Sequence, residues 1–209
     1  AIGTGVLQHC VDGAANIGIG SGAMDDWDVG GGTSTTVDGS VHNLMIGVDA
    51  GGGAWTNVVS AYNIGIGNYV MDAAMDGALS NTAIGYSAGT AITTGDGNTL
   101  VGMQAGDSLT TGGYNVCIGK DVVTSAVDSS GQFVIGNNTA GVADLTATFG
   151  NGANTASLGI DGSDTSWAAA SSDERYKENI ETSNAGLSFV NDLRPVTYNW
   201  KKAKDVQEE

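Results

Sequence analysis

The 209-residue sequence contains a single proline and two cysteines, and aromatic side chains make up only 6% of it. A globular core built from so few large side chains would be thin, which disfavours an ordinary globular domain. Apolar runs long enough to cross a bilayer are missing, and the first residues do not resemble a signal peptide. We therefore expect no membrane insertion.

Glutamate is missing from the first 170 residues, and positive charge is almost missing with it. Residues 1–170 hold 15 Asp and a single basic residue, Lys120, while residues 171–209 hold the remaining six basic residues and all five Glu. The formal charge is −14 for the first part and −2 for the second, which gives −16 in total. A chain this acidic repels nucleic acid and anionic membrane surfaces, so neither is an expected partner. Aspartate without glutamate is typical of turns, because Asp hydrogen-bonds its own backbone whereas Glu favours helices.

Glycine is abundant instead, with 34 residues, and many of them belong to a repeat. An Asn-x-x-(Ile/Val)-Gly phrase begins at Asn81, Asn98 and Asn115, always 17 residues apart, and Gln132 takes the Asn place in the next copy. Earlier copies begin at residues 16, 43 and 63, and the opening Ala-Ile-Gly fits the end of one more. We therefore expect the chain to begin inside a repeat. Self-similarity at a short period is the mark of a solenoid, in which stacked repeats bury what one repeat cannot.

The residue types explain what each repeat should do. The β-branched residues Ile84, Val101, Ile118 and Ile135 suit a pleated, half-buried strand. The following glycine permits a bend or the close approach of a neighbouring backbone, and the Thr-Thr-Gly runs at 93–95 and 110–112 favour a corner. The Asn residues are expected to stack as a hydrogen-bonded ladder. The predicted fold is all-β, either a β-solenoid or an intertwined β-helical fibre.

The cysteines fit this scheme without special chemistry. Cys117 occupies the position that Ala83 and Leu100 hold in neighbouring repeats, and Cys10 lies more than a hundred residues away. We interpret Cys117 as a small buried hydrophobe, in preference to a disulfide partner or a metal ligand.

Two repeats are longer than the rest and predict loops at residues 21–42 and 51–60. The first carries Asp26, Trp27 and Asp28, and the second carries Trp55. Insertions in a solenoid emerge on one face, often the binding face. An aromatic ring beside carboxylates suits a carbohydrate, so these four residues are the candidate receptor-binding group. The plainer alternative, which we favour, is that both tryptophans pack their loops against the rod.

Nothing else in residues 1–170 predicts a site. The Asp-rich loops do not match the spacing of a calcium loop, and His9 and His42 are isolated. Paired carboxylates for glycoside hydrolysis cannot be chosen from an Asp-rich chain without geometry. We expect no metal, no cofactor and no enzymatic activity in the repeat shaft, which we place at residues 1–136. Residues 137–170 are expected to be a β transition region.

Residues 171–209 differ in composition and predict a short α/β piece. Leu187, Val190 and Leu193 have helical spacing before Pro195, and the alternating residues Val196, Tyr198 and Trp200 predict a strand. The phrase Ser-Asp-Glu-Arg-Tyr-Lys-Glu-Asn-Ile at 172–180, followed by Leu-Arg-Pro-Val-Thr-Tyr-Asn-Trp at 193–200, closely resembles the start of the endosialidase-type intramolecular chaperone domain. Such domains end the chains of trimeric bacteriophage tail spikes and fibres. The repeats more weakly resemble those of trimeric adhesin heads.

The resemblance implies a self-cleaving assembly device. In the family the cut falls before the serine of the Ser-Asp pair, which corresponds here to the bond between Ser171 and Ser172. Ser172 would be the nucleophile, Lys177 its base, and Asp173 a neighbouring charge. From the residues alone, capping of a helix by Ser172 is the simpler interpretation.

Together these features predict a structural and receptor-binding segment of a homotrimeric bacteriophage tail fibre, located on the virion tail outside the cell. Its partners would be two more copies of the chain, other virion tail proteins, and a glycan or protein receptor on the host surface. The alternatives are a bacterial trimeric surface adhesin and a polysaccharide-degrading tail spike. Any enzymatic activity is at most one self-cleavage event in cis by a serine–lysine pair.

Overall fold

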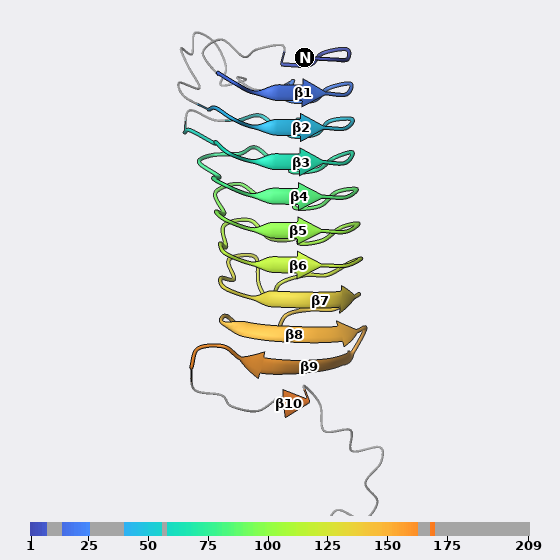
Figure 1. Cartoon of the computed structure of the whole chain (residues 1–209), viewed down its shortest axis with the longest axis vertical. Coiled ribbons are helices and arrows are strands. Elements are labelled where there is room, and N and C mark those ends of the chain that lie inside the picture. The colour runs from blue at the N-terminus through green and yellow to red at the C-terminus, as the bar shows by residue number, and fades with distance from the viewer. Residues whose placement is uncertain (8–13, 26–39, 56–57, 163–167, 170–209) are drawn as a thin grey trace, which may run out of the picture. The chain divides into compact units, whose positions relative to one another are not determined.

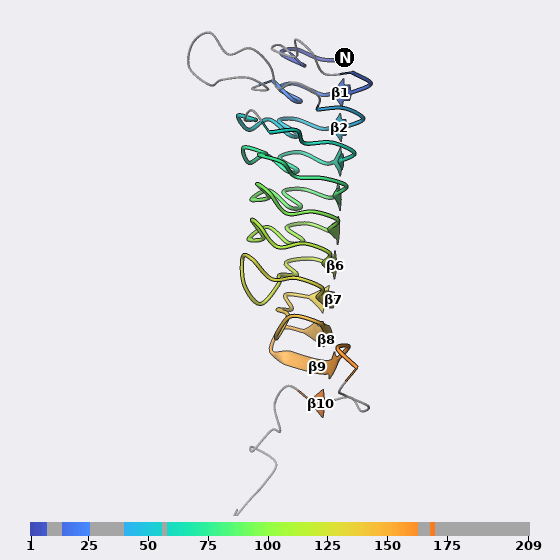
Figure 2. The same ribbon diagram turned by 90° about the vertical axis from the view of Figure 1, so that its left-hand side faces the viewer.

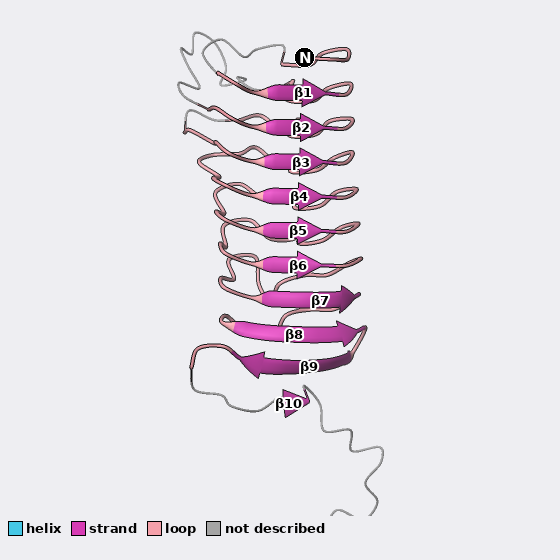
Figure 3. Cartoon of the chain, viewed as in Figure 1, coloured by secondary structure: helices cyan, strands magenta, loops and turns pink. Residues whose placement is uncertain are grey.

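The computed structural model describes residues 1–7, 14–25, 40–55, 58–162 and 168–169. The chain forms two compact units, Ala1–Ser172 and Asp173–Glu209, and the second lies outside the described residues. All regular elements in the described part of the first unit are β-strands (Figure 3). In these ranges no helix has the length and apolar character needed to cross a membrane.

In the described residues, ten strands form one sheet, stacked in the order of the sequence (Figure 1). The first eight run parallel to one another: β1 (Ile17–Ile19), β2 (Leu44–Ile46), β3 (Ile64–Ile66), β4 (Thr82–Ile84), β5 (Thr99–Val101), β6 (Val116–Ile118), β7 (Phe133–Asn137) and β8 (Thr146–Asn151). Strand β9 (Asn154–Gly159) then turns back antiparallel to β8, and β10 (Ala168–Ala169) pairs antiparallel with β9.

Between strands the chain coils away from the sheet and returns one level further along (Figure 2). The coils also bond to one another, because Met71 N–H donates to Ala88 O at 3.1 Å and Gly89 N–H donates to Ala105 O at 2.9 Å. At the return to the sheet, Ser80 N–H donates to Ala61 O at 2.9 Å. Each rung therefore closes within one chain. The predicted all-β fold is confirmed, and of its two expected forms the β-solenoid is the one that the chain adopts.

The core is a narrow column inside the coil. In each short strand the middle residue points inward and is buried, as Met45, Ala83, Leu100, Cys117 and Val134 show. Bulk at one inward position is matched by glycine at another: a Cβ on Gly106 would crowd the side chain of Leu100, and one on Gly65 would crowd Met45. A column this thin needs complementary sizes on successive rungs, since close packing leaves no room for an extra methyl group.

The predicted asparagine ladder is confirmed. Each Asn of the ladder before Asn115 accepts two hydrogen bonds from the next Asn along the stack, one from its backbone and one from its side chain. For Asn98 and Asn115 these bonds measure 3.0 and 3.0 Å, and Asn98 Nδ2 also donates to Asn81 Oδ1 at 2.9 Å and to Gly112 O at 3.0 Å. The same pattern links Asn16, Asn43, Asn63 and Asn81. Buried amides in this chain are thus satisfied by identical amides above and below.

The glycine that follows each strand has the close backbone approach that the repeat predicted. A Cβ on Gly67, Gly85 or Gly102 would overlap the carbonyl group of the equivalent glycine on the next rung. The same three residues have φ values of +143°, +139° and +135°, which L side chains rarely adopt. Steric contact and backbone conformation therefore both require glycine here.

The regular repeat ends at Gln132. Its N–H still donates to Asn115 Oδ1 at 3.0 Å, but its longer side chain turns to other partners, accepting from Ser125 N–H at 3.1 Å and donating to Asp144 at 3.3 Å. The predicted end of the shaft, Gly136, lies inside β7, and the parallel stack continues through β8. The β8–β9 hairpin then reverses the strand direction.

Candidate functional surfaces

The outer face of the sheet carries a continuous apolar surface, which we call the apolar strip. Because side chains alternate along a strand, the first and third residues of each core triplet point outward when the middle residue points inward. The strip runs from β1 to β8 and consists of Ile17, Ile19, Leu44, Ile46, Ile64, Ile66, Thr82, Ile84, Thr99, Val101, Val116, Ile118, Phe133, Ile135, Ala147 and Phe149.

Apart from Ala147, which is buried, these side chains stay partly accessible in the single chain. Ile66, Ile84 and Ile118 are 37–38% exposed, and Phe149 is 40% exposed. Every residue of the strip is apolar or threonine, although the chain as a whole carries a formal charge of −16. Contiguous apolar surface of this kind marks an interaction site more often than isolated exposed residues do.

Aromatic and apolar side chains continue along both edges of the strip. On the edge that precedes the strands, Tyr62 and Tyr114 are exposed, and the ring of Tyr62 stacks on His42 at 5.3 Å between centroids. On the edge that follows the strands, Tyr86 and Met103 are exposed, and Tyr86 meets Tyr69 edge-on at 5.7 Å. The apolar surface is therefore wider than the strands themselves.

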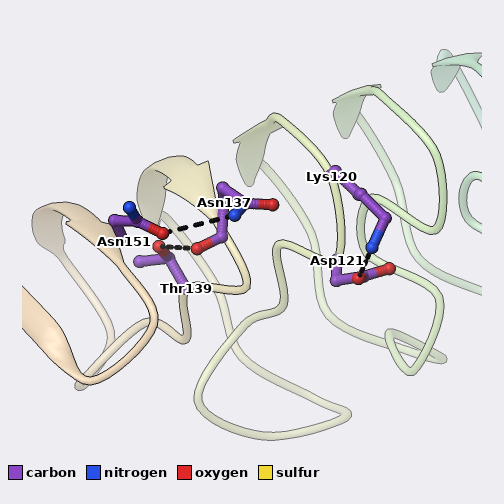
Figure 4. Close-up of polar contacts among 5 residues, drawn as sticks. All are labelled: Lys120, Asp121, Asn137, Thr139 and Asn151. Atoms are coloured by element: carbon purple, nitrogen blue, oxygen red, sulfur yellow. Dashed lines mark hydrogen bonds and ion pairs between the residues drawn. The ribbon is translucent and has the colours of Figure 1, made fainter.

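The edge that follows the strands becomes polar toward β8 (Figure 4). Lys120 Nζ pairs with Asp121 at 2.6 Å, and Asn137 Nδ2 donates to Asn151 Oδ1 at 3.2 Å, while Thr139 Oγ1 donates to Asn137 O at 3.1 Å. Such a solvent-exposed ion pair contributes about 0–1 kcal/mol to stability. Lys120 is the single basic residue before Arg175, so the surface of the rungs has almost no positive charge of its own.

Three aspartates gather beside the two enlarged loops. Burial raises the pKa of Asp72 to about 6, and the negative charges of Asp49 and, less strongly, Asp25 act in the same direction, while a hydrogen bond from Gly52 N–H opposes them. The described residues include no set of three or more His, Cys, Asp or Glu side chains arranged to hold a metal ion. The arrangement can keep a proton on Asp72 at a pH where an ordinary carboxyl group has lost it.

Trp55 does not provide the exposed ring that receptor binding would need. Its side chain is 2% exposed and belongs to the core cluster, and its Nε1–H donates to Gly51 O at 3.0 Å. A buried indole with a satisfied N–H stabilises its own loop and has no free face for a ligand. The expectation of Trp55 as a surface anchor is therefore wrong, and the favoured alternative, packing against the rod, describes its position.

Cys117 lies where the repeat placed it. Its side chain is fully buried in the core cluster, its thiol is free, and burial raises its pKa to about 12. A thiol held in the protonated form is a poor nucleophile and a poor metal ligand. The interpretation of Cys117 as a small buried hydrophobe is confirmed.

The remaining predicted site residues lie outside the described residues. These are Asp26, Trp27 and Asp28 of the first enlarged loop, and Ser172, Asp173 and Lys177 of the C-terminal segment. Their roles stay predictions.

The apolar strip was not predicted as a surface. The β-branched residues indicated strands, but not that their outward side chains form one shared face. The signal was present, because the two positions on either side of the inward residue never carry Asp in any copy of the repeat.

Residues 172–209 match the family model described as the chaperone of endosialidase. The match begins at the serine that the sequence motif singled out, and it covers the C-terminal segment only. No curated protein and no solved structure matches the chain. The chain thus combines a β-solenoid with a C-terminal segment that matches this family model.

Proposed function

We propose that this chain is a structural and receptor-binding segment of a homotrimeric bacteriophage tail fibre, whose C-terminal segment is a self-cleaving chaperone for trimer assembly. The observation that carries the proposal is the order of the two parts. A β-solenoid of stacked rungs is followed directly by a segment that matches the chaperone family at residues 172–209. A rigid shaft followed by an assembly device is the organisation that a fibre subunit requires.

The chemistry assigned to the chaperone is an acyl shift followed by hydrolysis. The Ser172 hydroxyl attacks the carbonyl carbon of Ser171, the peptide C–N bond breaks, and an ester forms on Ser172 Oγ. Lys177 takes the hydroxyl proton and returns it to the departing amine, and water then hydrolyses the ester. For this role the lysine must be neutral near pH 7, which requires burial or a cationic neighbour such as Arg175. Asp173 positions the charges around the pair.

The test is the mass of the chain recovered after expression. The wild-type chain is expected to be cut between Ser171 and Ser172, Ser172→Ala to stay uncut, and Lys177→Ala to be cut much more slowly. Ser171→Ala is the matched control, because it removes a neighbouring hydroxyl but not the nucleophile, and it should be cut normally. Cleavage of Ser172→Ala at the same bond would overturn the serine mechanism. Wild-type trimers that are never cut would make the segment an assembly domain without peptidase activity.

The receptor-binding part of the proposal assigns Trp27, Asp26 and Asp28 to a host glycan or protein, with other tail proteins holding the shaft in the virion. The support is the size of their loop, which is ten residues longer than a 17-residue repeat allows. A bacterial trimeric adhesin would use the same parts on a cell surface. Two measurements separate a tail fibre from an adhesin. A tail fibre is expected in purified virions, and the purified chain is expected to adsorb to the host of that phage.

One observation bears on the polysaccharide-degrading alternative. Burial and the nearby charge of Asp49 raise the pKa of Asp72 to about 6, and a raised pKa is one property that a general acid in glycoside hydrolysis needs. Incubation with host capsule should release no oligosaccharide if the chain only binds. Release that is abolished by Asp72→Asn would instead establish a depolymerase.

A further inference from the structure

Among the described residues, no other strand packs over the outer face of β1 to β7, and outward side chains such as Ile66, Ile84 and Ile118 stay partly exposed. We propose that it is the surface through which three copies pack around a common axis, each with its sheet toward the other two. This inference rests on the trimer of the proposed function and adds to it which face each chain uses.

Charge decides which face two copies can bring together. Each chain carries a formal charge of −16, so most of its surface repels an identical surface. The strip carries no ionisable side chain on any of the eight parallel strands. Two copies that meet there bury apolar area without burying like charges, which would otherwise cost free energy on every rung.

The strip alone has less area than a stable interface buries, so the residues along its edges must also contribute to the contact. Eight strands about 4.8 Å apart and three residues wide make a flat surface of roughly 38 Å by 10 Å, or about 380 Å². A stable interface buries about 800 Å² on each partner. The exposed residues along the edges, Tyr62 and Tyr114 on one side and Tyr86 and Met103 on the other, supply further area of the composition that interfaces favour.

In a threefold arrangement, each chain contacts one neighbour through its first edge and the other neighbour through its second edge. Contacts around a closed threefold axis are heterologous, so the leading edge of one chain meets the trailing edge of the next. The strips then face the axis, and identical rungs of three chains lie at the same height. Each rung contributes one apolar layer, for example Ile84 with Thr82, then Val101 with Thr99. The repeat therefore sets the register between chains as well as within each chain.

The first experiment introduces charge into the strip of the full chain. In Ile84→Asp/Ile118→Asp the new carboxylates of three chains converge on the axis, while both side chains are 38% exposed in the single chain and have no part in its core. Val127→Asp is the matched control, since Val127 is 51% exposed in a turn away from the strands. Light scattering should give three times the chain mass for the wild type and the control, and one chain mass for the double variant, with an unchanged circular dichroism spectrum.

The second experiment measures protection of engineered thiols and does not depend on a disruptive variant. In a Cys10→Ser background, Thr99→Cys and Val101→Cys place one thiol in each outward column of the strip, and Ser108→Cys places one on an exposed turn of the same rung. Cys117 is buried and free, with its thiol held protonated, so it should not react. Maleimide should label Ser108→Cys rapidly and the two strip thiols slowly, until the trimer is dissociated.

The outcomes separate this inference from the proposed function. A wild-type trimer whose strip thiols label as fast as Ser108→Cys, or whose double Asp variant stays trimeric, overturns the strip as the interface and leaves the trimer standing. A wild-type monomer overturns the trimer itself. A wild-type dimer overturns packing around a threefold axis.

Discussion

At the scale of single residues, the rung depends on four backbone positions with positive φ, only one of which always holds glycine. In the rung of Asn81 these are Ser80 at +58°, Gly85 at +139°, Ser87 at +52° and Gly89 at +58°. Values near +55° lie in the left-handed helical region, which L residues enter at a cost of about 1–2 kcal/mol, whereas +139° is essentially restricted to glycine. The invariant glycine of the repeat marks the one position with no alternative.

The glycine after each strand can be tested with a single methyl group. Gly85→Ala should lower the free energy of unfolding by about 3 kcal/mol or more, because its Cβ overlaps the Gly102 carbonyl and its φ is unsuited to alanine. Gly152→Ala is the control: φ is +61° and an added Cβ would meet nothing within 4 Å, so the cost should be about 1 kcal/mol. Urea denaturation measures both. Equal losses of unfolding free energy for the two variants would mean that the close approach of Gly85 to the Gly102 carbonyl group does not require glycine.

The asparagine ladder makes a second prediction at this scale. Asn98→Ala removes an acceptor shared by the N–H and the Nδ2 of Asn115, and it removes the donor to Gly112 O, all in a buried column. Unsatisfied buried polar groups cost about 1–3 kcal/mol each, so we expect a loss of about 3 kcal/mol or more. Asn137→Ala breaks only the exposed bond to Asn151 and should change stability by about 0.5 kcal/mol or less. Thermal unfolding of both variants under one condition measures the difference. Equal melting temperatures for the two variants would mean that the ladder hydrogen bonds do not stabilise the fold.

At the scale of elements, the enlarged loops differ from the regular rungs in charge and in packing. Beside these loops, burial raises the pKa of Asp72, and the negative charges of Asp49 and Asp25 add to the rise. The turns of the regular rungs carry few aspartates at equivalent positions of successive rungs.

The Asp72 carboxyl group predicts a pH-dependent contribution to stability. Its pKa is raised from 3.8 to about 6 in the folded chain, so the folded state holds this proton more tightly than the unfolded state does. This contribution is fully present below about pH 4 and is lost as the pH rises through about 6. Asp72→Asn keeps an acceptor for Gly52 N–H and removes the charge, so it should stabilise the chain at pH 7 relative to the wild type and change little at pH 4.

Melting temperatures at pH 4 and pH 7 measure this difference. Asp128→Asn, in an exposed turn, serves as the control for loss of one negative charge. A gain for Asp72→Asn that is the same at both pH values, or no larger than that of the control, would show that the pKa of Asp72 is not raised in the folded chain.

Substitution of Trp55 should affect the stability of the fold, whereas substitution of Trp27 should affect receptor binding. Trp55→Ala removes a buried ring and should cost about 3–5 kcal/mol of stability. Trp27→Ala should leave stability unchanged and weaken host adsorption by about 2 kcal/mol or more, because an aromatic anchor carries a large share of binding energy. Parallel measurement of melting temperature and adsorption tests both. Unchanged adsorption by Trp27→Ala would place the receptor site elsewhere.

At the scale of the whole molecule, the period of the repeat predicts an all-β stack of rungs and the part that each repeated residue plays in it. Asn-x-x-(Ile/Val)-Gly at constant spacing identifies an inward residue, a ladder amide and a glycine corner, and each lies where that pattern puts it. The sequence could not show whether rungs close within one chain, since the same spacing serves an intertwined fibre. Nor could it orient Trp55, because a large ring beside glycines fits a surface loop and a core position equally well.

The candidate surfaces were harder to predict for a physical reason. The apolar strip consists of half-exposed strand residues, and β-branched residues favour strands whether or not their outer face is covered. Only the register of the stacked strands shows that eight outward pairs join into one uncharged surface. The raised pKa of Asp72 is similarly a product of the fold, because burial causes most of it and the charges of Asp49 and Asp25 add to it.

The proposed function and the proposed interface both require that three solenoids associate. The ratio of the native mass of the full chain, measured by light scattering at micromolar concentration, to its mass after denaturation tests this. We expect a ratio of three, with a native β-rich spectrum that persists on dilution. A stable, folded monomer with a ratio of one would contradict it.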